Sequence, residues 1–385
     1  MRISLFCGTR PEAIKLAPVV HALQHHPHLK PHLCITGQHT DLLTPMLEFF
    51  QLQPNVHLRW ERLHRSLPES TSRLTEAIDG YLEETKPDMV LVQGDTASTF
   101  TAALTAFYHQ IPLGHIEAGL RTGSLQAPFP EEAYRQLTTR LADLHFASTP
   151  SNRQHLLDEG ISAEKIHLTG NTVVDALRWA RKQKVSSQLP PAWSSLLSSN
   201  HPLVVVTCHR RESWDEGMEI VGRSLRRLAH HCPDVQFLLP LHPNPRVREP
   251  LRRALSGGKE RHNLHLGEPL AYPAMLELLE AASLVMTDSG GIQEEAAALK
   301  TPVLVLREKT DRPEAVDAGM ALLVGLEEGR IVSEAVRLLH SAKEREQMML
   351  GSNPFGDGKA AERIVETCYR FLAGLPVPPL DYSGR

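Results

Sequence analysis

The sequence predicts an α/β protein with two doubly wound domains, each built on a parallel sheet. The 385 residues exceed the ~50–250 residues of a usual domain, so two domains are expected. Short apolar runs alternate with segments of helical periodicity, which is typical of parallel strands covered on both faces. The Ser- and Pro-rich stretch 184–202 interrupts this alternation and indicates a linker.

Each half of the chain supplies a set of apolar runs with the length of buried strands. In the first domain, 1–183, the expected strands lie at 3–8, 32–37, 89–94, 112–118, 144–149 and 166–170. In the second domain, 203–364, they lie at 203–210, 235–242, 263–267, 284–290, 301–306 and 321–325. Two such domains facing each other would place a ligand cleft at the carboxyl ends of their strands.

Composition limits the classes of partner. The net charge of −4 disfavours nucleic acid. The amino-terminal segment turns polar after a few apolar residues, and no apolar stretch approaches the ~18–20 residues that span a bilayer. The five cysteines are widely spaced and include no CxxC pair. We therefore expect reduced thiols in a cytoplasmic protein, with no membrane contact.

Two turns have the composition of anion sites. In FCGTRPEAIK, Arg10 and Lys15 fall near a helix start, where the helix dipole disfavours cations by ~0.3–1 kcal/mol unless an anion compensates. In TDSGGIQEE, Ser289, Gly290 and Gly291 offer a hydroxyl and backbone N–H groups at a helix start. The alternatives are solvated charges and an ordinary structural turn. Neither turn is a GxGxxG or P-loop motif, which disfavours nicotinamide cofactors and ATP.

Carboxylates follow neighbouring strands of the first half. Asp95 follows a buried strand at a helix start, where it could also serve as an N-cap. Glu117 ends the next strand, where capping does not explain it, and Glu131 begins a helix one turn before Arg135. Acids at strand ends that face cationic groups suit acid/base chemistry on an anionic substrate.

Basic side chains follow strands of the second half in the same way. His209 and Arg210 follow its first strand, His242 its second, and Arg312 the strand after the glycine turn. They suit phosphate oxygens, although a basic surface cluster is the alternative. The sequence has no Cys/His metal spacing and no Ser-His-Asp order, so we expect a reaction without metal or cofactor.

Motifs that span nearly the whole chain carry a family resemblance. They are, in order, GTRPEAIKLAPV, QGDT, HIEAGLRTG, PFPEE, LTGNTVVDAL, HRRES, TDSGGIQEEAAAL, RPEAV and NPFGDGKA. The chain thereby resembles the non-hydrolysing UDP-N-acetylglucosamine 2-epimerases. The resemblance implies a glycosyltransferase-B-like architecture, in which two Rossmann-like domains face a central cleft and the carboxyl-terminal helix, 365–385, crosses back to the first domain. It also implies a homodimer that supplies UDP-N-acetylmannosamine for surface polysaccharides.

The resemblance further implies a mechanism and a set of site residues. UDP is eliminated to leave bound 2-acetamidoglucal, and it adds back after C2 receives a proton on the opposite face. The residues matching catalytic positions are Asp95, Glu117, Glu131, His209, Lys15 and Arg135. Those matching UDP-sugar contacts are Arg10, Lys15, Asp95, Glu117, His209, Leu270, Met275, Ser289, Gly290, Gly291, Glu295 and Arg312. Glu295 would accept from the ribose hydroxyls, whereas Glu294, about 100° around the helix, would be structural.

Some bacterial members bind a second UDP-N-acetylglucosamine as an activator, and Gln38, Arg210 and His242 match that site. The chain departs from the family pattern at Gln93, where many members have His, and at Met275, where an aromatic often lines the uracil pocket. Four alternatives share much of the pattern. They are an epimerase of a modified UDP-sugar of the 2,3-diacetamido uronic acid type, a hydrolysing epimerase, a UDP-sugar glycosyltransferase of the same fold, and a non-catalytic nucleotide-sugar sensor.

Overall fold

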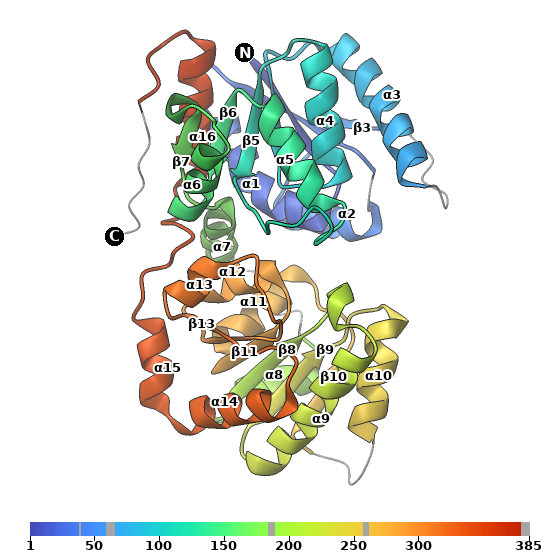
Figure 1. Ribbon diagram of the computed structural model, residues 1–385, viewed down its shortest axis with the longest axis vertical. Helices are drawn as coiled ribbons and strands as arrows, with labels where there is room; N and C mark the ends of the chain where they lie inside the picture. The colour runs from blue at the N-terminus through green and yellow to red at the C-terminus, as the bar shows by residue number, and fades with distance from the viewer. Residues whose placement is uncertain (38–39, 59–65, 184–188, 257–261, 379–385) are drawn as a thin grey trace. The chain divides into compact units, whose positions relative to one another are not determined.

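The computed structural model describes residues 1–37, 40–58, 66–183, 189–256 and 262–378. The chain divides into two compact units (Figure 1). Unit 1 comprises Met1–Lys182 and Phe355–Arg385, and unit 2 comprises Gln183–Pro354.

Unit 1 holds a parallel sheet with the strand order β3-β2-β1-β4-β5-β6-β7. Its strands are β1 (Arg2–Cys7), β2 (Lys30–Ile35), β3 (Val56–His57), β4 (Met89–Gln93), β5 (Leu113–Ala118), β6 (Leu144–Ala147) and β7 (Ile166–Leu168). Its helices are α1 (Arg10–His25), α2 (Thr40–Phe49), α3 (Leu67–Thr85), α4 (Ala97–Tyr108), α5 (Glu131–Leu141), α6 (Pro150–Asp158), the short η1 (Ala163–Lys165), α7 (Thr172–Lys182) and α16 (Ala360–Leu372).

Unit 2 holds a second parallel sheet, with the order β10-β9-β8-β11-β12-β13. Its strands are β8 (Leu203–Thr207), β9 (Gln236–Pro240), β10 (Leu264–Gly267), β11 (Leu284–Thr287), β12 (Val303–Val305) and β13 (Ala321–Leu323). Its helices are α8 (Pro191–Leu197), η2 (Arg211–Ser213), α9 (Glu216–His231), α10 (Pro245–Ser256), α11 (Tyr272–Ala281), α12 (Gly290–Leu299), α13 (Pro313–Asp317), α14 (Glu328–His340) and α15 (Ala342–Met349).

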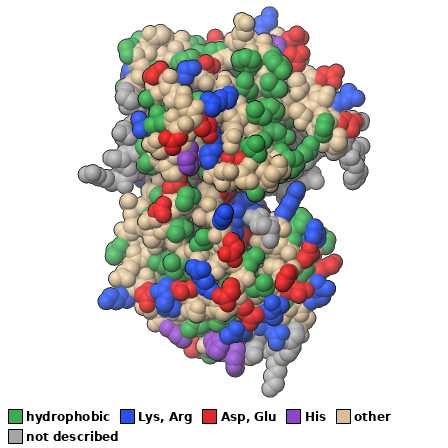
Figure 2. All heavy atoms as spheres, viewed as in Figure 1, with side chains coloured by type: hydrophobic (Ala, Val, Ile, Leu, Met, Phe, Trp, Pro, Cys, Tyr) green, Lys and Arg blue, Asp and Glu red, His purple; other side chains and the backbone are tan. Residues whose placement is uncertain are grey.

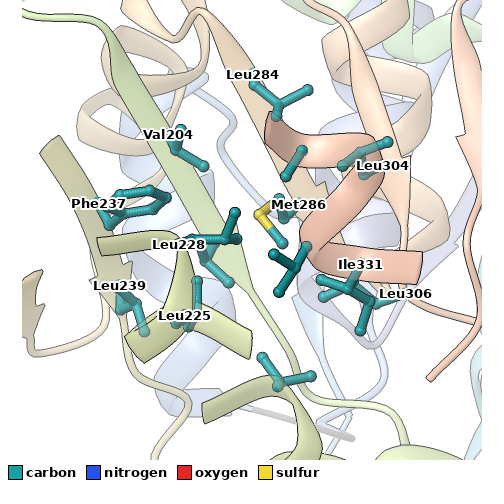
Figure 3. Close-up of a cluster of buried hydrophobic side chains, with 14 of the residues drawn as sticks. Val204, Leu225, Leu228, Phe237, Leu239, Leu284, Met286, Leu304, Leu306 and Ile331 are labelled. Atoms are coloured by element: carbon teal, nitrogen blue, oxygen red, sulfur yellow. The ribbon is translucent and has the colours of Figure 1, made fainter. Parts of the chain in front are cut away.

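The predicted α/β fold with two parallel sheets is confirmed, and every strand expected from the sequence is present. The expectation omitted only β3, whose two residues are too short to show a pattern. Helices cover the sheets, which explains the uniformly apolar strands. In unit 2, Val204 of β8 and Met286 of β11 are buried in a core that includes Leu225 of α9 and Ile331 of α14 (Figure 3).

The stretch expected as a linker is in part structured. Pro191–Leu197 forms α8, whose Trp193 is 4% exposed. A Cβ atom added to Gly267 of β10 would lie 2.6 Å from the Trp193 ring. The stretch is polar overall, so the sequence indicated a linker, but its one tryptophan packs against the second sheet.

The chain re-enters unit 1 at Phe355, earlier than the expected boundary at residue 365. Phe355 is 1% exposed, and its carbonyl accepts from the Asn171 N–H at 2.7 Å. The Asp175 carboxylate accepts from the N–H groups of Ala360 and Ala361 at 3.2 and 2.9 Å, at the start of α16. Helix α16 packs against α1 and α7. The packing of α16 on unit 1 therefore involves a helix cap by Asp175, which is distant in the sequence and could not be predicted from a local pattern.

All five cysteines are buried free thiols. Within the ranges that the structure describes, no helix combines the length and apolar character needed to cross a membrane.

Candidate functional site

In each sheet, successive strands are added first to one side of the first strand and then to the other. This reversal falls between β1 and β4 in unit 1 and between β8 and β11 in unit 2. Doubly wound sheets bind ligands at the carboxyl ends of strands beside such a reversal. The two predicted anion turns follow β1 and β11, Asp95 follows β4, and His209 follows β8. Each unit therefore presents one group of candidate site residues, and the two groups are described separately.

In unit 1, Lys15 of α1 and Glu117 of β5 form an ion pair with both side chains 9% exposed. Glu117 also accepts hydrogen bonds from Gln93 Nε2 to Oε2 at 2.5 Å and from Asn171 Nδ2 to Oε1 at 3.3 Å. The Glu117 carboxylate therefore supplies negative charge that compensates the positive charge of Lys15 near the start of α1.

The backbone at Glu117 is strained. Its φ is +65°, and the β5–β6 register shifts between Ile116 and Ala118. A non-glycine residue in the left-handed region costs of order 1–3 kcal/mol and persists where its surroundings over-determine it. Here the bulge turns the Glu117 carboxylate toward Lys15 and Gln93.

Asp95 forms an ion pair with Arg135 of α5, and the same guanidinium donates to Glu132 Oε2 at 3.1 Å. The alternative role of Asp95 as an N-cap is wrong, because Thr96 caps α4 by accepting from the Thr99 N–H at 3.2 Å. Arg135 and Glu132 are 4% and 0% exposed, whereas the Asp95 side chain is 25% exposed. Asp95 is therefore the accessible member of a largely buried charge cluster.

Glu12 is a site residue that the sequence reasoning did not single out. Its Oε2 accepts from the Gly8 and Thr9 N–H groups at 2.6 and 2.8 Å, and its Oε1 accepts from Thr96 Oγ1 at 2.5 Å. Burial raises the pKa of Glu12, and these hydrogen bonds oppose the shift. The spacing Thr9–Glu12 is that of a capping box, which is the signal that could have found it.

The remaining predicted residues of unit 1 begin helices. Arg10 is the first residue of α1, and Glu131 is the first of α5; both are half-buried. The expected partnership of Glu131 with Arg135 is replaced by that of Glu132, the next residue along the helix.

In unit 2, the buried Asp288 organises the turn after β8. Its carboxylate accepts from the His209 N–H at 3.0 and 3.1 Å and from the Arg210 N–H at 3.0 Å, and its Oδ1 lies 3.4 Å from His209 Nδ1. The His209 side chain remains 38% exposed. Asp288 was also missed, although it stands directly before the serine-glycine turn.

The Ser289-Gly290-Gly291 turn begins α12 as predicted. The Ser289 hydroxyl accepts from the Ile292 N–H at 3.4 Å, so it caps the helix. Neither glycine has a positive φ. At Gly290 the requirement is space, because an added Cβ would lie 3.2 Å from Asp311 Oδ1 and 3.4 Å from Arg210 Nη2. Gly291 is exposed, and an added Cβ there would meet only Ser289 Oγ at 4.0 Å.

Arg312, expected among the UDP-sugar contacts, is 7% exposed and pairs with the buried Glu294. This contact fits the structural role expected for Glu294. Arg210 Nη2 lies 3.5 Å from Asp311 Oδ2. Both arginines therefore belong to an ionic cluster beside the start of α12.

The other predicted residues of unit 2 lie around the same strand ends. The rings of His209 and His242 stack with centroids 5.9 Å apart. Partial desolvation lowers the pKa of His242, and the Asp288 charge opposes this effect. Leu270 precedes α11, while Met275 on α11 and Glu295 on α12 are 9% and 6% exposed. Gln38 lies outside the described residues.

Comparison with known proteins connects these features to one family. The family model described as UDP-N-acetylglucosamine 2-epimerase matches residues 21–368. The chain is 44% identical to the UDP-N-acetylglucosamine 2-epimerase of Salmonella typhimurium over 97% of its own length and 100% of the relative. It is 46% identical to that of Escherichia coli K12, with 95% and 98% covered.

Solved structures agree with these sequence matches. The Neisseria meningitidis UDP-GlcNAc 2-epimerase bound to UDP-GlcNAc superposes with a TM-score of 0.88 at 42% identity, covering 96% of this chain and 100% of that one. Staphylococcus aureus MnaA in a co-structure with UDP gives 0.90 at 38% identity, covering 99% and 100%. Acinetobacter baumannii MurG, at 13% identity and a TM-score of 0.58 over 95% and 98% of the two chains, shares the fold.

Proposed function

The chain belongs to the UDP-N-acetylglucosamine 2-epimerase family, a family of isomerases, and we propose that it inverts C2 by eliminating UDP and adding it back. The products would be UDP-N-acetylmannosamine and, in reverse, UDP-N-acetylglucosamine, with the former supplying surface polysaccharides. The observation that carries the proposal is the pair of ionic contacts Lys15–Glu117 and Asp95–Arg135 at the ends of neighbouring strands.

Unit 2 is proposed to hold UDP. The start of α12 presents backbone N–H groups and a positive dipole end, which favour the diphosphate. His209, held by Asp288, adds an imidazole donor for the charge that develops on the β-phosphate as the C1–O bond breaks. Glu295 lies one turn along α12 from Gly291, at a distance that suits the ribose hydroxyls. Leu270 and Met275 would line the uracil pocket.

Unit 1 is proposed to supply the acid/base groups. Inversion at C2 needs proton transfer on both faces of the sugar, hence more than one acid or base. Glu117, Asp95 and Glu131 are the candidates, and Lys15 and Arg135 hold the first two in place. Arg10, at the start of α1, would assist the diphosphate.

Deuterium exchange tests this function. Incubation with UDP-N-acetylglucosamine in deuterated water, followed by proton NMR, should give UDP-N-acetylmannosamine with deuterium at C2. Free N-acetylmannosamine would instead indicate the hydrolysing class. Binding without exchange would contradict the epimerase and leave a sensor, a glycosyltransferase, or an epimerase of a modified UDP-sugar. A parallel incubation with a UDP-2,3-diacetamido uronic acid separates the last of these.

We also propose a homodimer through α4 and α5. Hydrophobic side chains gather over these two helices of unit 1 (Figure 2). Phe107, Tyr108 and Leu137 are 56%, 65% and 49% exposed, and Phe100 and Tyr134 stack between the helices with centroids 5.1 Å apart. An exposed apolar surface of this kind marks an interaction site. Leu137→Glu should yield monomers in sedimentation velocity, whereas Leu350→Glu, at an 80% exposed position of unit 2, should not.

Location and regulation complete the proposal. The five buried free thiols support a cytoplasmic location.

A second, activating UDP-N-acetylglucosamine would contact Gln38, Arg210 and His242. Support comes from the latter two, which follow the adjacent strands β8 and β9. Sigmoidal dependence of the rate on substrate would support this activation, and hyperbolic dependence would contradict it.

A further inference from the structure

Glu117 is held by three side chains from three different elements. Lys15 reaches it from α1, Gln93 from the end of β4, and Asn171 from the turn before α7. Lys15 and the two amide groups approach it as donors. Hydrogen bonds donated to a carboxylate, one of them from an ammonium group, stabilise its ionised form.

Of the two amide contacts, that of Gln93 is the shorter. Of the three donors, Gln93 is the one that binds Glu117 Oε2. Lys15 and Asn171 share Oε1, while Gln93 Nε2 lies 2.5 Å from Oε2. Gln93 is 3% exposed and lies in β4, between α-helical layers, so its amide is fixed by packing. Removing this donor would take away a short hydrogen bond to Glu117 Oε2.

Two titratable groups of the described structure near Glu117, His115 and Asp95, do not replace that donor. His115, two residues earlier on β5, donates from Nε2 to the Gly94 carbonyl, and burial lowers its pKa to about 4. Asp95, which follows Gly94, is a carboxylate engaged by Arg135. The neutral His115 and the anionic Asp95 cannot supply a positive charge to Glu117.

We propose that Gln93 is a positioning residue that holds Glu117 ionised, so that Glu117 accepts the C2 proton on one face of the sugar. The inference rests on the proposed function. In this step the C2–H bond breaks as the proton bonds to a Glu117 oxygen. The C2–H electron pair forms the C1–C2 double bond, and the C1–O pair leaves with the β-phosphate of UDP. Gln93 does not touch the reacting atoms, and it acts through Glu117.

The test removes the donor while keeping the size of the side chain. Gln93→Met should move the acid limb of the kcat profile up by about one pH unit, because a carboxylate that loses a hydrogen bond to its charged form becomes easier to protonate. At a pH on that limb the rate should fall roughly tenfold relative to wild type. The affinity for UDP should not change, because Gln93 is not among the proposed UDP contacts.

A second variant reverses the contact. Gln93→Glu places two carboxyl groups together, so they would share one proton and titrate as a pair. The acid limb of its kcat profile should lie at a higher pH than that of Gln93→Met, because Glu117 is fully ionised only after the shared proton is lost. Gln154→Met is the control, because Gln154 makes a like contact with Asp158 at 2.7 Å on the exposed face of α6. It should leave the profile unchanged.

The outcome that overturns the proposal is an acid limb that stays at the wild-type pH in both Gln93→Met and Gln93→Glu. Failure of the proposed function is distinguishable, because it would appear as absence of exchange in the wild-type protein. In that case carbon-13 NMR of labelled glutamate in the wild type and Gln93→Met reads the Glu117 titration directly. An identical titration in both would overturn the positioning role.

Discussion

The Glu12 carboxylate accepts a hydrogen bond from the Thr96 hydroxyl at 2.5 Å, which fastens the first turn of α1 to the start of α4. The same carboxylate accepts from the Thr9 N–H at 2.8 Å. Since Arg10 follows Thr9 and Asp95 precedes Thr96, one buried side chain sets the spacing between a candidate phosphate contact and a candidate catalytic acid.

Glu12→Ala should therefore lower both stability and turnover. Removal leaves buried donors unsatisfied, which costs about 1–3 kcal/mol for each group. We expect a loss of about 3 kcal/mol in the free energy of unfolding, measured by urea denaturation, with a drop in kcat. Glu12→Gln should recover most of both, because one oxygen still accepts the two N–H groups. Equal losses in the two variants would contradict a role in spacing.

Asp288→Asn should weaken UDP binding. The carboxylate fixes the His209 and Arg210 backbone through hydrogen bonds of 3.0–3.1 Å, and an amide can present an acceptor on only one side. Isothermal titration with UDP should show a loss of affinity of roughly tenfold, about 1.4 kcal/mol. Asp234→Asn, at an exposed position of unit 2, should bind like wild type. Wild-type affinity in Asp288→Asn would remove Asp288 from the binding machinery.

The two glycines of the α12 turn should respond differently to alanine. Gly291→Ala should keep the melting temperature, because the added Cβ meets only Ser289 Oγ at 4.0 Å, yet lose UDP affinity because the Cβ stands where a phosphate would approach. Gly290→Ala should lower the melting temperature, since its Cβ would crowd Asp311 at 3.2 Å. Thermal melts and UDP titration of both variants check this. Unchanged UDP affinity in Gly291→Ala would argue against phosphate at this turn.

Asp175 should make stability depend on pH. Burial raises its pKa from 3.8 to about 6 in the folded protein, so the folded state binds more protons between these values. The contribution of Asp175 to stability is therefore greatest below about pH 4 and is lost as the pH rises through about 6, by up to about 3 kcal/mol.

Asp175→Asn removes this titration. Relative to the variant, the melting temperature of the wild type should fall as the pH rises from about 4.5 to about 7, and the difference should then become constant. A difference that is constant with pH would mean that the carboxyl does not change its proton affinity on folding. The comparison of two proteins cancels the other titrating groups that they share.

The sequence predicted the strands because each one is a short, continuous apolar run between turn residues. It also indicated Glu117 and Asp95, because Glu117 lies at the end of a buried strand and Asp95 follows another. It could not assign partners that lie far apart in the chain. Arg135 pairs with Asp95 and Arg312 with Glu294 through the packing of separate elements. Asp288 was hidden for the same reason, since its partners are the backbone N–H groups of His209 and Arg210. Glu12 was overlooked although its capping-box spacing from Thr9 stands in the sequence.

Positional isotope exchange tests the central claim, cleavage of the C1–O bond, most directly. UDP-N-acetylglucosamine labelled with oxygen-18 in the bridge between C1 and the β-phosphate is incubated with the protein, and phosphorus NMR follows the label. Elimination predicts that the label moves from the bridge to the non-bridging β-phosphate oxygens, at least as fast as the sugar epimerises. Epimerisation with the label retained in the bridge would contradict it, because the C1–O bond would then have stayed intact.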